Sequence, residues 1–388
     1  MARPINPLLI GRPEIEGMIY YSPTGLEAVL ECPRRRYFQK HERKKLTWPD
    51  FAKGTHLHRK IEELRLHHLR KRARYKSAEA FANVIANDWQ RNVIKEGKIR
   101  GDKIVWKDEK QPYIIKAEIK EIGLRAYPLL MKEAETNPPI IFSNLTKKGN
   151  IVYRTAYEFE FIYKGRGFSG EIDEIRKEND KIIIRDYKTG KWKFIEDKQG
   201  YAFQPTEYEF AVCYLCNTDE TFRKILGVTK EEAESWIKEP ESMSDNIIFE
   251  YYMLDLPREW DDKIKEYVII NKNSGPVIKV ERENFHYKEL CLNIDGANAM
   301  LSDMSDKNYY TPIRGYHCNR CFYQKECENM TKKTDVHLRQ ITLQEYISKI
   351  NQTKNYIIPD SIPLKQEIKQ AEFDFVRGTK NKKIETKT

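Results

Sequence analysis

Two short stretches of the chain carry acids and a lysine at a spacing that suits metal-assisted chemistry, Gly-Glu-Ile-Asp at residues 170–173 and Asp-Tyr-Lys at residues 186–188. Two neighbouring carboxylates cannot both ionise cheaply unless a cation lies between them. Mg²⁺ typically takes one or two carboxylates and binds substrate phosphate, and it lowers the pKa of a bound water. Lys188 would position or deprotonate that water, or neutralise the developing negative charge. Asp173, Asp186 and Lys188 therefore predict attack on a phosphodiester.

The elements that must position these residues are two consecutive strands. Residues 181–190 form a β-branched run ending in Thr-Gly, which predicts a buried strand. Because side chains alternate across a strand, Asp186 and Lys188 should share one face. A tight Glu-Asn-Asp turn should return Asp173, on a strand expected over residues 168–176, to the side of Asp186. The alternative interpretation is an ordinary exposed hairpin with a surface ion pair.

A histidine is a further candidate ligand. Leu57, Ile61 and Leu64 follow the core spacing of a helix expected from residue 54 to about residue 75, and His58 lies on a neighbouring face. Neutral imidazole is a common metal ligand, so His58 could complete the metal's ligand set. A lone histidine beside an apolar stripe is more often a packed or surface residue.

Gln204 and Tyr208 are four residues apart on a helix that Pro205 can open at its first turn. Gln204 could hydrogen-bond a backbone phosphate or a base. Tyr208 could stack on a base or hold the lysine strand. A plain amphipathic helix is the alternative for this segment.

The chain has seven cysteines but no signal peptide or membrane span, which argues against a disulfide framework. Cys318, Cys321 and Cys327 are clustered, and Cys32 lies far upstream. Four thiolates can hold either Zn²⁺ or an iron–sulfur cluster, and spacing alone does not separate the two. The remaining three cysteines are interpreted as core packing or inert thiols: Cys213, Cys216 and Cys291.

The order of these motifs along the chain resembles the iron–sulfur branch of the RecB-like PD-(D/E)xK nucleases, whose members include CRISPR-adaptation nucleases, the AddB nuclease domain and exonuclease V. The resemblance implies an α/β fold with a restriction-endonuclease-like core, in which helices flank a mixed central sheet. It also implies an iron–sulfur staple made by four cysteines, whereas residues 78–150 and 217–300 are expected to be long helical insertions relative to compact members. Ile172 stands where the superfamily's name would put proline.

The resemblance assigns roles to particular residues. It implies that a [4Fe–4S] cluster is bound by the four separated cysteines, Cys32, Cys318, Cys321 and Cys327. It implies that Mg²⁺ or Mn²⁺ is bound by His58, Asp173, Asp186 and the Tyr187 carbonyl. Lys188 matches the catalytic lysine, with Asp173 and Asp186 as its catalytic partners. Gln204 and Tyr208 match the family's Q-x-x-x-Y element.

One nuclease unit stapled by the cluster is predicted over residues 1–330, because the cluster must join residue 32 to residues 318–327. Its parts are a cluster arm at 1–45, a helical module at 46–150, the catalytic core at 151–216, an insertion with core-completing elements at 217–304, and a second cluster arm at 305–330. Residues 331–388 are expected to be a polar, partly disordered extension.

The formal net charge of +10 suits a protein that follows a phosphate backbone. Basic residues gather at 34–45 and 59–76, and Arg34, Arg35 and Arg36 are the candidate DNA contacts. A solvated helix face is the alternative for part of the second cluster.

The leading hypothesis is a metal-dependent deoxyribonuclease, an exonuclease on single-stranded or end-frayed DNA with a structural iron–sulfur cluster. A non-catalytic or partner-activated DNA-binding subunit is the alternative, and a zinc-stabilised structural protein is a third hypothesis. No P-loop motif occurs, so any unwinding would come from a partner of helicase or integrase type. CRISPR adaptation and a phage, plasmid or repair pathway are both open. A cytoplasmic, non-secreted protein without membrane association is expected.

Overall fold

The computed structural model describes residues 18–69, 75–145, 150–190, 195, 202–236, 245–254, 258–261, 266–269, 276–306, 312–313 and 316–333. Met1–Asp335 form one compact unit, and Val336–Thr388 form a second. The second unit contains most of the predicted polar extension and lies outside the described residues. Several members of the second basic cluster, at residues 70–74, also lie outside them.

The central sheet has the strand order β14 (Val277–Val280), β11 (Ile247–Met253), β10 (Lys181–Lys188) and β9 (Glu174–Glu178). β10 and β11 are parallel, and the other two pairs are antiparallel, so the sheet is mixed as expected. β10 is the predicted buried strand, and its six residues from Ile182 to Tyr187 are all buried. The β9–β10 turn contains Asn179 at a φ of 55°, a conformation that asparagine tolerates well.

A second sheet has the order β1 (Tyr20–Tyr21), β8 (Arg166–Ile172) and β7 (Tyr157–Tyr163). The single strand expected over residues 168–176 is wrong, because the chain bends at Asp173 and divides into β8 and β9. β8 pairs with β7, whereas β9 pairs with β10. The bend therefore places Asp173 where the chain passes from one sheet to the other.

One face of the central sheet is covered by α7 (Phe203–Thr218), which packs against β11 and β8. Around α7 lie α1 (Pro23–Glu31), α8 (Glu220–Leu226), α9 (Lys230–Trp236) and α10 (Asn284–Asp306). Ile182, Ile184 and Phe249 project from the sheet into this core. Polar side chains cap two of these helices: Gly25 N donates to Ser22 Oγ at 3.2 Å, and Glu232 N donates to Thr229 Oγ1 at 3.1 Å.

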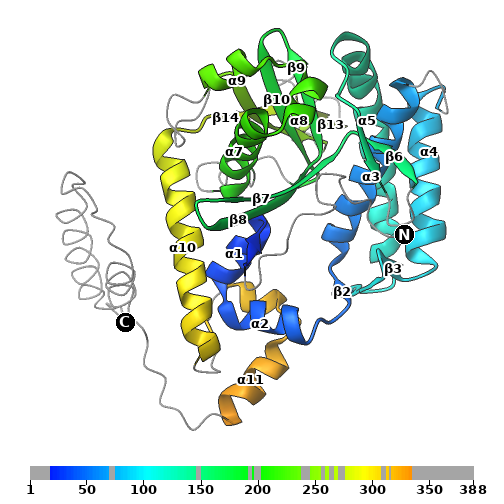
Figure 1. Ribbon diagram of the computed structural model, residues 1–388. Coiled ribbons are helices and arrows are strands. Elements are labelled where there is room, and N and C mark those ends of the chain that lie inside the picture. The colour runs from blue at the N-terminus through cyan, green and yellow to red at the C-terminus, as the bar shows by residue number, and fades with distance from the viewer. Residues whose placement is uncertain are drawn as a thin grey trace, which may run out of the picture. The chain divides into compact units, whose positions relative to one another are not determined.

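The other face is covered by a helical module: α3 (Pro49–Leu69), α4 (Ala78–Asp88), the π-helix η2 (Trp89–Ile94) and α5 (Gln111–Thr136). Tyr187 of β10 and Tyr252 of β11 belong to this second core. α3 begins five residues before the expected start at residue 54, and Pro112 lies in the first turn of α5. The three helices α3, α4 and α5 lie together to one side of the sheet (Figure 1).

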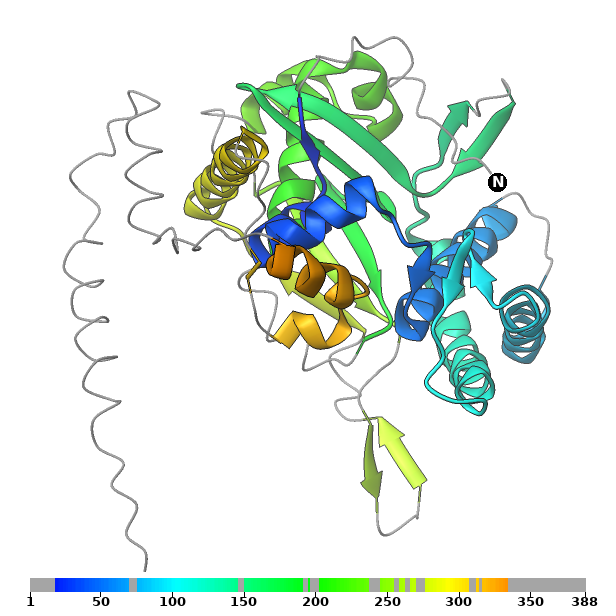
Figure 2. The same ribbon diagram turned by 90° about the horizontal axis from the view of Figure 1, so that it is seen from below.

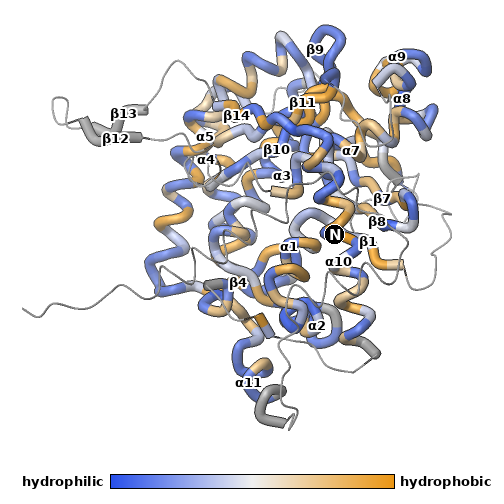
Figure 3. The backbone as a smooth tube through the Cα atoms, turned by 90° about the vertical axis from the view of Figure 1, so that its left-hand side faces the viewer, coloured by the Kyte–Doolittle hydropathy of each residue, from blue (hydrophilic) through white to orange (hydrophobic). Residues whose placement is uncertain are grey.

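Short elements surround these layers. They are β2 (Leu46–Thr47), β3 (Lys98–Ile99), β4 (Asp102–Ile104), the pairs β5 (Phe142–Leu145) with β6 (Ile151–Arg154) and β12 (Arg258–Asp261) with β13 (Glu266–Ile269), α2 (Pro33–His41), the 3₁₀ helix η3 (Tyr316–Arg320), and α11 (Gln324–Lys333). α2 and α11 lie close together (Figure 2), and α11 is mainly hydrophilic (Figure 3). Two stacked ring pairs join residues near the N-terminus of the described chain to the C-terminal arm, Phe38 with Tyr323 at 5.5 Å and Trp48 with Phe322 at 4.7 Å between ring centroids.

Candidate active site

Asp173 is fixed by the backbone of the neighbouring strand. The β9–β10 ladder ends at the pair Arg185–Glu174, so the next backbone donors of β10 need another partner. Tyr187 N donates to Asp173 Oδ2 at 2.9 Å and thereby replaces a ladder bond with a bond to the carboxylate. The bend between β8 and β9 thus holds this carboxylate beside the end of β10, where Asp186 lies.

Asp186, Lys188 and Gln204 form a closed set of contacts. Asp186 and Lys188 share one face of β10, as predicted, and Lys188 Nζ lies 2.6 Å from Asp186 Oδ2. Gln204, near the start of α7, donates from Nε2 to Asp186 Oδ1 at 2.6 Å and accepts from Lys188 Nζ at 2.9 Å. On the neighbouring strand, the ring of Tyr251 lies with its centroid 5.0 Å from Lys188 Nζ.

His58 enters the same group from α3. Its Nδ1 lies 3.3 Å from Asp173 Oδ1 and 3.2 Å from Asp173 Oδ2. His58 is about one-third exposed, whereas Asp186 is almost fully buried. Four elements, α3, the β8–β9 bend, β10 and α7, therefore bring together every predicted catalytic side chain.

Charge shapes the titration of this group. Burial raises the pKa of Asp173, but His58, the Tyr187 N–H and Lys188 outweigh burial and lower the pKa below its ordinary value. Burial also raises the pKa of Asp186, and there the positive charge of Lys188 does not offset burial and the nearby Asp173. Burial lowers the pKa of His58, and Asp173 more than reverses this shift. The two carboxyls are thus driven apart in pKa, which is typical of functional sites.

Tyr208 and α7 differ from the sequence-based alternatives. The Tyr208 hydroxyl donates to the Glu171 carbonyl at 2.8 Å, so this side chain ties α7 to β8. Tyr208 is only 5% exposed, which leaves no face for stacking on a base. An ordinary amphipathic helix is also wrong for α7, because residues 205–213, 215 and 216 are all buried.

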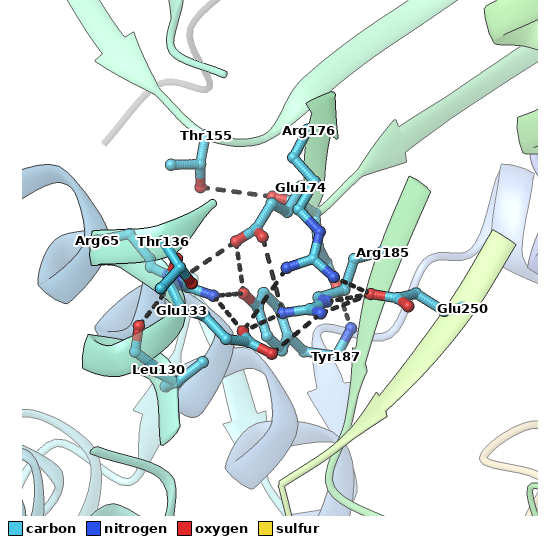
Figure 4. A network of polar contacts seen from close by, with 11 residues as sticks. Arg65, Leu130, Glu133, Thr136, Thr155, Glu174, Arg176, Arg185, Tyr187 and Glu250 are labelled. Carbon is cyan, nitrogen blue, oxygen red and sulfur yellow. Dashed lines mark hydrogen bonds and ion pairs between the residues drawn. The ribbon is translucent and has the colours of Figure 1, made fainter. Parts of the chain in front are cut away.

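A second group of charges, drawn in Figure 4, includes Arg185 and contacts Tyr187, and strand alternation places both residues on the face of β10 opposite Asp186 and Lys188. The Tyr187 hydroxyl donates to Glu174 Oε2 at 2.5 Å, and Arg185 lies 2.5 Å from Glu250. The network holds three arginines and three glutamates from five elements: Arg65, Arg176, Arg185, Glu133, Glu174 and Glu250. Such a balanced set avoids the cost of an unpaired buried charge, which is about 3–5 kcal/mol.

The four separated cysteines come together at one place. Cys32 lies between α1 and α2, Cys318 lies in η3, Cys321 follows η3, and Cys327 lies in α11. All four line a single cavity of about 50 Å³. Burial raises the pKa of the Cys321 thiol, and a bound cation would lower this pKa by favouring the thiolate.

Arg34 belongs to the cysteine cavity rather than to an exposed surface. Its Nη1 donates to the Cys327 carbonyl at 3.2 Å and to Cys327 Sγ at 3.7 Å, and the side chain is fully buried. The predicted DNA contact of Arg34 is therefore wrong. Arg35 is half-buried, lines the cavity and pairs with Glu31 at 3.2 Å, while Arg36 is half-buried. DNA contacts by Arg35 and Arg36 stay predictions.

Comparison with known protein families identifies the chain. The model of the PD-(D/E)XK nuclease superfamily matches residues 20–328, a span that includes every site residue named above. The chain belongs to the PD-(D/E)XK nuclease superfamily. This membership makes a nuclease the expected type of enzyme, and nucleases of this superfamily usually use Mg²⁺ or Mn²⁺. No curated protein matches the chain.

The residue types at this site match the ligands of a superfamily metal site better than their present positions do. Two carboxylates and an imidazole are donors that divalent cations accept, and Asp186 Oδ2 is buried and accepts no hydrogen bond despite its ion pair with Lys188. Among the described residues, no three histidine, cysteine, aspartate or glutamate side chains converge closely enough to hold an ion. This finding applies to the acids and to the cysteines alike. The predicted role of the Tyr187 carbonyl stays a prediction.

Several residues that contact the candidate site residues were not predicted from the sequence. Tyr251 lies beside Lys188, and Arg154 joins Glu62 of α3 to Glu171 of β8. Arg185, which directly follows three buried isoleucines in β10, was a visible signal of a buried charge, but its partners are distant in sequence. Of the described helices, none combines the length and apolarity needed to cross a lipid bilayer.

Proposed function

We propose that this protein is a metal-dependent deoxyribonuclease that acts as an exonuclease on single-stranded or end-frayed DNA. The observation that carries the proposal is the contact of Lys188 Nζ with Asp186 at 2.6 Å, beside the His58–Asp173 pair. An acid pair, a histidine and a lysine from separate elements have thus been brought to one place, within a chain of the nuclease superfamily.

In this proposal Asp173, Asp186 and His58 hold Mg²⁺ or Mn²⁺, with the Tyr187 carbonyl as a further ligand. The bound ion would supply an activated water and neutralise charge on the phosphate. Gln204 holds the Lys188 amine at the end of β10, where the amine can orient a water or donate to a developing oxyanion. Tyr251 and the buried charge network keep β10 and β11 in place around this amine.

The decisive experiment compares wild type with Lys188→Ala on end-labelled single-stranded DNA, with Mg²⁺ or Mn²⁺, under anaerobic conditions. Products shortened progressively from one end, made by wild type and not by Lys188→Ala, support the proposal. Lys177→Ala is the matched control, because it removes a half-buried lysine from β9 whose described hydrogen bond is to the Gly227 carbonyl. A well-folded wild type that binds DNA without cutting it would favour the alternative, a DNA-binding or partner-activated subunit.

We also propose that the four cysteines of the shared cavity hold a [4Fe–4S] cluster, which would join the two arms of the chain. Thiolates are the usual ligands of such clusters, but they also bind Zn²⁺. Iron and sulfide analysis with visible absorption separates the two, because Zn²⁺ does not absorb in the visible. A colourless protein with one zinc per chain would overturn the cluster while leaving the nuclease proposal intact.

A further inference from the structure

Helix α3 is fastened to the sheets at two points that follow His58 along the helix. Glu62 is four residues after His58 and Arg65 is seven after it, so all three lie along one side of α3. Each of the two later residues takes part in a separate ionic cluster. The ligand candidate His58 therefore lies on a helix whose position is set by charges rather than by apolar packing alone.

The first cluster is centred on Arg154, the last residue of β6. Its Nε donates to Glu62 Oε1 at 2.9 Å, its Nη1 to Glu158 Oε1 at 3.1 Å and its Nη2 to Glu171 Oε1 at 2.6 Å. All three guanidinium nitrogens are used, and the side chain is 13% exposed. Glu171 lies on β8 two residues before Asp173, so Arg154 joins the helix of His58 to the strand that leads to Asp173.

The second cluster is centred on Arg65, which is 1% exposed (Figure 4). Its Nη1 donates to the Leu130 carbonyl at 2.6 Å, and its Nη2 contacts Glu133 at 3.0 Å. Arg65 Nε lies 3.4 Å from Glu174 Oε2, and Nη2 lies 3.4 Å from the Tyr187 hydroxyl. Glu174 and Tyr187 directly follow Asp173 and Asp186 in sequence, so this cluster reaches the strands of both acids.

We propose that Arg154 and Arg65 are positioning residues that set the distance between His58 and Asp173 and thereby affect how tightly the protein binds a metal ion. This inference rests on the proposed function in so far as those two residues are metal ligands. Residues that orient metal ligands typically change metal affinity about 10- to 100-fold when they are replaced. A purely structural role would lower stability and leave metal affinity unchanged.

Arginine suits this task because its planar fork can bond several carboxylates in fixed directions, whereas a lysine amine is a flexible point charge. Arg154→Lys keeps the positive charge near the site but loses the fixed directions in which arginine bonds several carboxylates. An effect of this variant on metal binding is therefore an effect of position and not of net charge.

The test measures Mn²⁺ affinity of the purified full chain, by electron paramagnetic resonance or calorimetry, together with Tm in the absence of metal. We expect Arg154→Lys and Arg65→Lys each to weaken Mn²⁺ binding about 10-fold. The matched control is Arg166→Lys. Arg166 also lies on a strand of this region, and it bonds Asp295 of α10 through two nitrogens at 3.0 and 2.7 Å. The Arg166→Lys variant should be less stable than wild type but should bind Mn²⁺ with unchanged affinity.

A double-substitution cycle shows whether the arginines act through the histidine. In a His58→Ala background, Arg154→Lys should cause no further loss of Mn²⁺ affinity. Unchanged affinity in Arg154→Lys, an equal loss in the Arg166→Lys control, or a full additive loss without His58 would each overturn the proposal. If Arg65→Lys does not fold, the more exposed Arg154 decides the question alone. Because Mn²⁺ binding is measured without DNA, a wild type that binds the ion but cuts nothing contradicts only the proposed nuclease.

Discussion

At the scale of single residues, Gln204 shows how the structure changes the meaning of a motif. Sequence reasoning offered it as a contact to phosphate or base. Both functional atoms of its amide are instead used inside the site, one by Asp186 at 2.6 Å and the other by Lys188 at 2.9 Å. We therefore expect Gln204 to act by orienting the Lys188 amine, so that its effect on DNA cleavage is indirect.

Gln204→Ala should lower kcat and leave the KM for DNA nearly unchanged. Hydrogen bonds to charged groups contribute about 1.5–3 kcal/mol, which corresponds to a loss in kcat of about 10- to 100-fold. Single-turnover cleavage of an end-labelled strand measures the loss. Asn217→Ala is the control, since Asn217 lies on the same helix and bonds the Cys213 and Ala233 carbonyls instead. A raised KM with unchanged kcat would restore the DNA-contact hypothesis for Gln204.

At the scale of elements, the packing of α7 on β8 depends on a glycine. A Cβ atom at Gly170 would lie 2.6 Å from the ring of Phe159 and 2.9 Å from Cε1 of Tyr208. Only glycine lets Tyr208 cross β8 closely enough to bond the Glu171 carbonyl. The glycine of the Gly-Glu-Ile-Asp stretch thus positions the helix that carries Gln204.

Gly170→Ala should destabilise the fold by about 1–3 kcal/mol, the usual cost of overpacking, and should also reduce cleavage. The matched substitution is Gly123→Ala, where a Cβ would lie 2.6 Å from Ile85 Cδ1 in the helical module. It should cost similar stability with little effect on cleavage at temperatures well below Tm. Urea denaturation and cleavage rates measured on both variants check this, and equal loss of activity in the two would count against a specific role for Gly170.

Features that depend on residues close in sequence were predicted, whereas features that depend on contacts between distant residues were missed. The shared face of Asp186 and Lys188 follows from strand alternation, a local property of the sequence, so it was predicted correctly. The bend at Asp173 was missed because it depends on Tyr187 N, a partner from another strand. Arg34 was misassigned for the same reason, since its partner Cys327 is 293 residues away. The ion pairs of the network drawn in Figure 4 join α3, α5, β9, β10 and β11, and no pattern of residues close in sequence predicts such a network.

At the scale of the whole molecule, the net charge of +10 should make DNA binding depend strongly on salt. For single strands, log K falls with log salt concentration by about 0.7 for each phosphate neutralised. In the uncleaving Lys188→Ala protein, adding Arg36→Ala should reduce this slope by about 0.7 if Arg36 contacts a phosphate. Lys224→Ala is the control, because Lys224 is exposed on α8, which Figure 1 shows at the opposite end of the unit from α2. An unchanged slope removes Arg36 from the DNA path.

The two ends of the described chain hold each other even without a cluster. Lys44 N donates to the Tyr323 hydroxyl at 3.0 Å, and Lys44 Nζ lies 2.6 Å from Glu326. Trp48 Nε1 donates to the Arg320 carbonyl at 3.1 Å. These contacts join the two ends of a long loop of the chain that contains the whole catalytic core. A cluster bound by the four cysteines would join the same two ends more strongly.

Cys32→Ser should therefore lower Tm and expose the C-terminal arm to protease, while a partly folded core remains. The physical reason is that the loss of one cysteine ligand would break the connection that the cluster makes between α2 and α11. The remaining polar and aromatic contacts between the arms are individually weak. Differential scanning calorimetry and limited proteolysis measure the two effects, with Cys291→Ser, a half-buried thiol of α10, as the control. If Cys32→Ser melts with the control and retains all its iron, the cysteines do not act as a staple. A loss of Tm together with a loss of iron would instead show that the cluster stabilises the whole nuclease unit by joining its two arms.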